Sequence, residues 1–117
     1  MKVFEKELES LDTLDPEVVE RIENARDKVL EAVETASGSE KQSKAIRIQC
    51  EAVCEFIDKL WGEGTAKSIF GERTNLLMCL KAFDDILQGI EADTQEQYSQ
   101  LQQIAAKYSP KRIAERK

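Results

Sequence analysis

Residues 60–76, LWGEGTAKSIFGERTNL, interrupt a chain whose remainder has the periodicity of helices. The stretch holds three of the chain's five glycines. Glycine adopts a positive φ at little cost, and it therefore ends helices and forms tight turns. We predict that one helix ends at Gly62, that Thr65 caps a single turn over residues 66–70, and that Gly71 ends this turn with a positive φ. The chain would thereby turn a corner between two long helices.

The same stretch contains a lysine–serine pair, which raises the question of a phosphate-binding loop. Such a loop needs two glycines in the pattern G-x-x-x-x-G-K-[ST], because bare backbone amides must surround the phosphate oxygens. Ala66 precedes Lys67 and Ser68 where the second glycine belongs, and Trp61 occupies the place of the first. A predicted helix precedes the stretch where the motif has a strand. We therefore expect no nucleotide site here.

The apolar residues of the corner have a structural use instead. We expect Ile69 and Phe70 to pack on Trp61 as a plug at one end of a helical bundle. Loops of this length that carry their own packing are often functional surfaces. Gly64, Ile69 and Phe70 are therefore candidate interaction residues.

Apolar residues elsewhere recur at alternating steps of three and four, which is typical of amphipathic helices. The first three stripes consist of Val18, Ile22, Ala25, Val29, Ala32 and Ala36; of Ile46, Cys50, Val53, Ile57 and Leu60; and of Leu76, Leu80, Phe83, Leu87 and Ile90. A fourth, in a last helix, consists of Tyr98, Leu101, Ala105 and Tyr108. Such stripes must face one another, so the sequence predicts an all-α fold, a helical bundle of four to five helices with a glycine-rich corner between the second and third main helices.

Local capping signals place the ends of these helices. Asp15 before Pro16 starts the first helix, because the carboxylate accepts from free amides and proline suits the first turn. Ser37 and Gly38 stop it. The predicted caps of the other helices are Ser39 or Ser43 for the second, Thr74 or Asn75 for the third, and a capping box of Thr94 and Gln97 for the last.

The N-terminal segment, residues 1–13, has a weaker pattern. Val3, Phe4, Leu8 and Leu11 would suit either a further short helix or a loose arm. No strand-like alternation persists long enough to predict a sheet.

Length and charge limit the classes of partner. A chain of 117 residues fits one domain over 1–117. Its net charge is −6, but residues 107–117 hold five basic residues and one acidic residue, so this end is +4 and the rest is −10. The acidic body predicts no nucleic-acid and no membrane partner, while the basic tail over 109–117 is read as a solvated terminus, with docking on an acidic partner as the alternative.

The N-terminal residues and the cysteines indicate the compartment. The start of the chain is charged, and no apolar run approaches the ~20 residues of a membrane span, so we expect a cytoplasmic protein without signal peptide or anchor. Cys50, Cys54 and Cys79 are an odd number of cysteines, which favours reduced thiols. Without C-x-x-C spacing they are better explained as small buried hydrophobes than as zinc ligands.

Catalytic chemistry has little support in the residues. The chain has no histidine, which removes the usual general base and the commonest zinc ligand. Glu31, Glu34, Glu55 and Asp58 are similar to the paired acidic motifs with which all-α nucleotide pyrophosphatases hold magnesium. Helical spacing, however, points Glu34 and Glu55 roughly 140–160° away from the apolar stripes. We predict no enzyme, no cofactor and no metal site.

The last predicted helix is the best candidate for association. Its narrow stripe of Tyr98, Leu101, Ala105 and Tyr108 is flanked by glutamines at 95, 97, 100, 102 and 103. A thin apolar seam between uncharged side chains suits helix pairing, either within the chain or between copies. Tyr98, Leu101 and Tyr108 are therefore candidate interaction residues, and a homo-oligomer is the expected assembly.

One family resemblance extends this interpretation. The order Gly62-Glu63-Gly64-Thr65, Ile69-Phe70-Gly71, Asn75-Leu76, Cys79 and Ala82-Phe83 resembles a pattern in small, acidic, helical proteins of phages and prophages of Gram-positive bacteria. The resemblance covers about residues 60–90. It implies a product of the tail-morphogenesis region, such as a tail assembly chaperone, whose partners are other tail-module proteins. The alternatives are a cytoplasmic helical adaptor and, third, a magnesium-dependent nucleotide pyrophosphatase.

Overall fold

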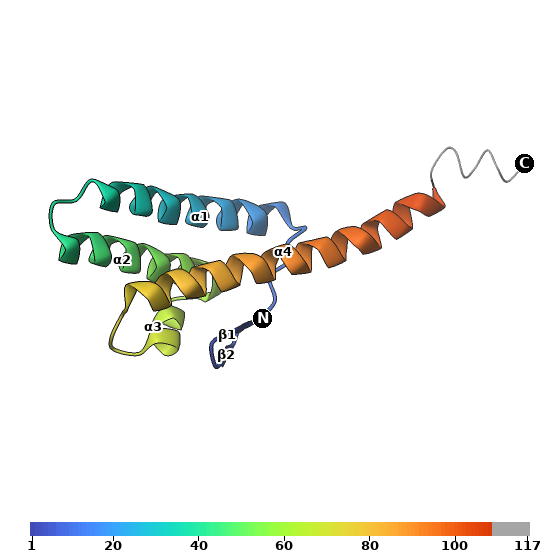
Figure 1. The fold of residues 1–117 in the computed structure, drawn as a ribbon. Helices are drawn as coiled ribbons and strands as arrows, with labels where there is room; N and C mark the ends of the chain where they lie inside the picture. Colours follow the sequence, from blue (N-terminus) through green and yellow to red (C-terminus); the bar gives the residue numbers. More distant parts are fainter. Residues whose placement is uncertain (109–117) are drawn as a thin grey trace, which may run out of the picture.

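The computed structural model describes residues 1–108, and the basic tail predicted over 109–117 lies outside the described residues. The described part is an all-α helical bundle with a small N-terminal hairpin, as Figure 1 shows, so the predicted fold class is confirmed. The elements in chain order are β1 (Lys2–Val3), β2 (Lys6–Glu7), α1 (Pro16–Ser37), α2 (Gln42–Trp61), α3 (Thr65–Phe70) and α4 (Leu76–Lys107).

The helices α1 and α2 form an antiparallel pair at the centre of the fold (Figure 1). As predicted, the Asp15 carboxylate accepts from the Glu17 amide at 2.9 Å at the start of α1. The chain reverses at Gly38, where the helix ends. The apolar stripes face each other across the pair, and Val29 of α1 and Val53 of α2 are completely buried.

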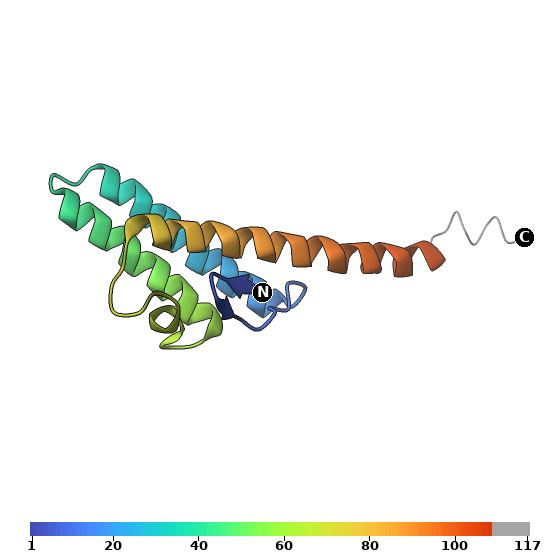
Figure 2. The ribbon, with the colours of Figure 1, turned by 60° about the horizontal axis from the view of Figure 1, so that its bottom comes forward.

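The long helix α4 crosses α2 and buries its own first part there. Its buried residues are Cys79, Ala82, Phe83 and Ile86. The ring of Phe83 meets the ring of Phe56 edge to face, with centroids 5.0 Å apart. Beyond Ile90 the helix leaves the bundle and projects as an arm, which Figures 1 and 2 show from two directions. We call residues 91–108, which end at the C-cap residue Tyr108, the α4 arm.

The N-terminal segment folds as a β-hairpin, so the predicted helix or loose arm is wrong. Lys2 pairs with Glu7 and Val3 with Lys6 in an antiparallel register, and Phe4 in the turn has a φ of 54°. Each strand has two residues, too few for an alternating pattern to be visible in the sequence. Contacts with distant elements hold the hairpin, because Val3 is completely buried in the common core.

Two further contacts attach the N-terminal segment to the helices. The Trp61 indole donates from Nε1 to the Glu9 carbonyl at 2.8 Å. A Cβ added at Gly89 in α4 would lie 3.0 Å from Cε of Met1, so the absence of a side chain at Gly89 makes room for the methionine.

The glycine corner has the predicted geometry at Gly62 and Gly71, but the residue that caps α3 is not the predicted one. Gly62 and Gly71 have φ values of 112° and 76°, where glycine is favoured. Thr65 does not cap α3, since its hydroxyl donates to the Gly62 carbonyl at 2.8 Å. The cap comes from α2: the Asp58 carboxylate accepts from the Ala66 amide at 2.8 Å.

Two other predicted caps are wrong and one is right. The second helix starts after Lys41, and neither Ser39 nor Ser43 caps it. Asn75 caps α4, accepting from the Met78 amide at 3.2 Å. At Thr94 the helix does not restart. The Thr94 hydroxyl donates back to the Ile90 carbonyl at 2.7 Å, and the helix runs without a break from Leu76 to Lys107.

Candidate interaction surface

The α4 arm presents an apolar face that no other part of residues 1–108 covers. The face consists of residues that are wholly or half exposed: Tyr98 (50%), Leu101 (47%), Ile104 (55%), Tyr108 (72%) and the exposed Ala105. We call these five residues the arm face. At 100° per residue they span roughly 120° around the helix, which is the width of a core-facing stripe. The seam predicted from the sequence is therefore open to solvent and does not pack within the described chain.

Sequence reasoning missed one member of this face. Ile104 was not in the predicted stripe, although it follows Leu101 by three residues and precedes Tyr108 by four. That spacing is the signal that could have identified it. With Ile104 included, the face has the width that helix pairing requires.

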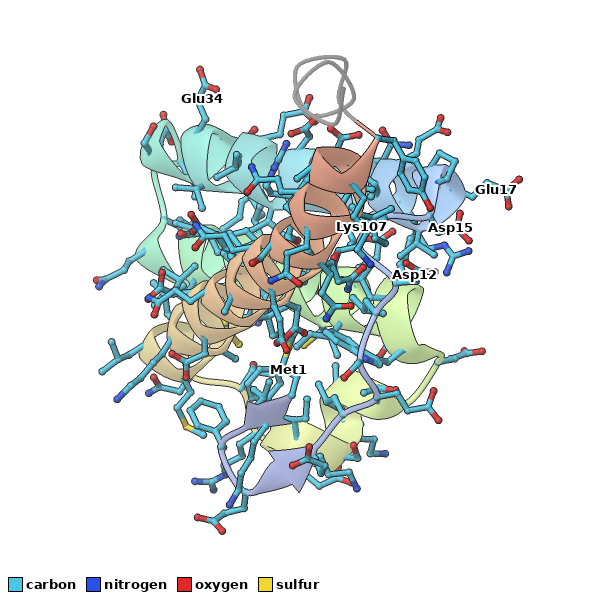
Figure 3. All side chains as sticks on the ribbon, turned by 90° about the vertical axis from the view of Figure 1, so that its right-hand side faces the viewer. Met1, Asp12, Asp15, Glu17, Glu34 and Lys107 are labelled. Carbon is cyan, nitrogen blue, oxygen red and sulfur yellow. The ribbon has the colours of Figure 1, made fainter. Side chains whose placement is uncertain are left out.

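Charges divide the arm along its length. Its first turns carry Glu91, Asp93 and Glu96, while Lys107 stands at its far end. Figure 3 views the molecule toward this end and shows Lys107 on the helix nearest the viewer. The arm is thus acidic beside the body and basic away from it.

Exposed apolar side chains also occur on the bundle itself. They are Leu14, Leu30, Val33, Leu77 and Met78. Such residues are common singly on soluble surfaces and carry little information there. The arm differs because its apolar residues lie on one continuous helix face that has no neighbour.

The corner residues have different exposures. Gly64 is exposed, Ile69 is half-buried and Phe70 is 9% exposed. Phe70 meets the ring of Phe4 edge to face at 6.3 Å, and Trp61 and Ile69 pack against the same core cluster. The corner is therefore mostly part of the core. It leaves Ile69 at the edge of an open hollow.

This hollow has a volume of about 220 Å³. It lies between the hairpin, α3 and the start of α4, and Phe4, Ile69 and Met78 contribute its apolar walls. Through this hollow the corner could contact a partner side chain.

The lysine–serine pair of the corner is engaged in local contacts. Lys67 lies 3.4 Å from the Glu72 carboxylate, and the Ser68 hydroxyl donates to the Thr65 carbonyl at 2.6 Å. The Ala66 amide, at the start of α3, is already bonded to Asp58. These groups do not form a cradle for phosphate.

The acidic residues of the pyrophosphatase-like pattern do not converge. Glu31, Glu34 and Glu55 are exposed, and Figure 3 shows Glu34 pointing away from the body. Asp58 is the only one of the four that is half-buried, and its carboxylate caps α3. Within residues 1–108 no group of three or more cysteine, aspartate or glutamate side chains is arranged to hold a metal ion.

The three cysteines meet where α4 crosses α2. Cys50 and Cys79 are buried, Cys54 is half-buried, and all three are free thiols. Burial raises the pKa of the Cys79 thiol from 9.0 to about 12, and its hydrogen bond with Cys50 acts in the same direction. Burial also raises the pKa of Cys54. Thiols with raised pKa values stay protonated at neutral pH, where they are poor nucleophiles and poor metal ligands.

An open groove of about 540 Å³ lies beside these thiols. Ile46, Cys50 and Cys54 form its floor along α2, with Arg47 and Glu51 beside them and Thr74 opposite. The groove contains apolar surface and one charge of each sign. It lacks a convergent set of polar groups that would define a small-molecule site.

In the part of the chain that the structure describes, no helix combines the length and the apolar content needed to cross a membrane.

Comparison with known proteins yields one match. Residues 5–117 match the model of a protein family described as a family of unknown function (DUF6673). The match includes α1 to α4, and therefore the arm. No curated protein and no solved structure matches the chain.

Proposed function

The chain belongs to DUF6673, a family of unknown function, and we propose that it is a non-enzymatic phage or prophage protein of tail assembly. In this proposal it is a tail assembly chaperone or a related morphogenesis factor, acts in the bacterial host cytoplasm and works through protein–protein contacts. Its partners are other proteins of the tail module. The phage setting rests on the resemblance of residues 60–90.

The exposed arm face is the observation that carries the proposal. An apolar helix face that its own chain leaves open costs free energy in water, and such faces mark interaction sites. The face is presented on a helix that projects from the body, so a partner helix can approach it without displacing the core. An assembly chaperone needs such a surface, because it keeps apolar helices of its client in solution until they reach their place.

The remaining surface supports a binding role over a catalytic one. The four carboxylates considered for magnesium stand apart, and Cys54, which lines the 540 Å³ groove, has a pKa raised by burial. The arm face, by contrast, is a continuous apolar helix face that no other part of residues 1–108 covers.

The proposal is tested with one substitution in the arm face and a matched control. Leu101→Asp places a charge in the middle of the face, whereas Gln103→Asp places the same charge about 200° away, on the opposite side of the helix. The purified variants are mixed with the tape-measure protein and the major tail protein encoded nearest to the gene. We expect the wild type and Gln103→Asp to retain a tail protein and Leu101→Asp to lose it at least tenfold.

Far-UV circular dichroism of each variant verifies that the bundle remains folded. Failure of the wild type to bind any tail-module protein would reject the chaperone role and leave the adaptor hypothesis. A gene position between the major tail protein and the tape-measure protein would support the phage setting, and a position remote from phage genes would remove it.

A further inference from the structure

We propose that the arm face also binds the arm of a second copy, in antiparallel orientation and centred near Gln100. This inference deepens the proposed function, since it names the molecule that covers the face before a tail protein does. It rests on three observations: the open face, the division of charge along the arm, and a row of residues at one edge of the face.

The row at the edge of the face consists of Asp93, Gln100 and Lys107. Successive members are seven residues apart, so they lie nearly in line along the helix. Viewed down the helix axis, Asp93, Gln100 and Lys107 are rotated from Leu101 by about 80°, 100° and 120°, all in the same direction. Asp93 and Lys107 are equally distant from Gln100. A two-fold axis beside Gln100 therefore brings each Asp93 next to Lys107 of the other copy.

The charges of this row are free to form such pairs. Among residues 1–108 the ion pairs are Met1–Glu7, Arg26–Asp27 and Lys67–Glu72, so neither Asp93 nor Lys107 is engaged. In a parallel pair of arms, aspartate would face aspartate and lysine would face lysine. Opposite charges therefore favour the antiparallel arrangement.

The apolar residues suit the same arrangement. Around the axis, Leu101 packs beside Gln97 and Tyr98 of the second copy, and Ile104 packs beside Thr94 of the second copy. The Tyr98 side chains of the two copies approach each other on the edge opposite to the charged row. Each contact occurs twice, as a symmetric dimer requires.

The distribution of charge along the whole arm also favours the antiparallel arrangement, and it acts at longer range. The acidic first turns, with Glu91, Asp93 and Glu96, lie beside the basic end of the second arm. The paired segment covers about two heptads, which is short for an isolated coiled coil, so we expect a dissociation constant in the micromolar range. Such a dimer is weak enough for a tail protein to displace one arm.

The test is a charge exchange measured by sedimentation equilibrium of the full chain. We expect Asp93→Lys and Lys107→Asp each to weaken dimerisation about tenfold, because each places two pairs of like charges in the dimer. The double variant D93K/K107D restores the opposite pairs, and its dissociation constant is expected to return to within about threefold of the wild type. Glu34→Lys, which makes the same change in net charge as Asp93→Lys but lies on α1 and away from the arm, is the control and should leave dimerisation unchanged.

Three results would overturn the inference. A wild type that stays monomeric at tens of micromolar excludes the dimer. Single variants that associate as well as the wild type indicate parallel arms, and a double variant as weak as the singles indicates that the arm docks elsewhere on the second copy. None of these results concerns tail proteins, so the pull-down decides the proposed function separately.

Discussion

The Cys79 thiol illustrates how position in the fold changes the chemistry of one residue. Its side chain is completely buried between α4 and α2, in contact with the other two thiols. The sequence identifies it as a small apolar residue at the edge of a stripe. The depth of its burial follows from the crossing of two helices that are distant in sequence.

This burial predicts a loss of stability at alkaline pH. The pKa of Cys79 is about 12 in the folded protein, so between pH 9 and 12 the unfolded chain loses the thiol proton while the folded chain keeps it. The unfolded state then binds fewer protons, and the free energy of unfolding falls as pH rises, by about 1 kcal/mol at pH 10. Urea unfolding at pH 8 and pH 10 measures this decline.

Cys79→Ala is the comparison for this prediction. The variant is less stable at every pH because it leaves a small cavity, but its decline between pH 8 and 10 should be shallower than that of the wild type. The two proteins share every other side chain, so the difference between their declines reports on position 79. Identical declines would contradict the raised pKa.

At the scale of elements, α3 depends on a neighbouring helix for its start. A six-residue helix is too short to be stable alone, and its first residues supply no side-chain cap. Asp58 of α2 provides the cap, and Phe70 attaches the other end of α3 to the core. The corner is therefore a consequence of packing as well as of its glycines.

Removing this cap should destabilise the protein measurably. Asp58→Ala leaves the Ala66 amide without its acceptor, and we expect a loss of about 1 to 2 kcal/mol in the free energy of unfolding. Glu55→Ala, one turn earlier on α2 and exposed, is the matched control and should change stability by less than about 0.5 kcal/mol. Equal effects of the two substitutions in thermal unfolding would refute the capping role.

At the scale of the whole molecule, the arm is separate from the packed body. The buried residues of α4 end at Ile86, and Leu87 and Ile90 are the last residues of the helix that pack on the core cluster. The α4 arm adds no buried apolar residue to the bundle. Its helix is continuous with the packed part, which fixes the direction in which the arm face is presented.

Shortening the chain to residues 1–92 tests this division. Because residues 93–108 include no buried residue, we expect the melting temperature to change by no more than a few degrees and unfolding to remain cooperative. Self-association and binding of tail proteins should both be lost. Differential scanning calorimetry and sedimentation measure the two properties, and a melting temperature lowered by ten degrees or more would show that the arm stabilises the body.

Local rules in the sequence determined most of the helical skeleton. Asp15, Gly62, Gly71 and Asn75 act through neighbours within one turn, so their effects can be predicted without knowing the fold. The apolar stripes fixed which faces of α1, α2 and the first part of α4 are buried. The sequence also indicated the stripe around Leu101, which became the arm face.

Only the tertiary structure decided the features that depend on distant contacts. The hairpin at Val3 forms because α4 and α3 supply its core. Asp58 caps α3 because the glycine corner brings the start of α3 back beside the end of α2. Thr94 lies inside a continuous helix, where the sequence predicted the start of a new one. A periodic stripe shows that a helix face is apolar but cannot show what covers it, because burial depends on where other elements pack. The arm face is exposed because the other elements bury only the first part of α4, up to Ile86.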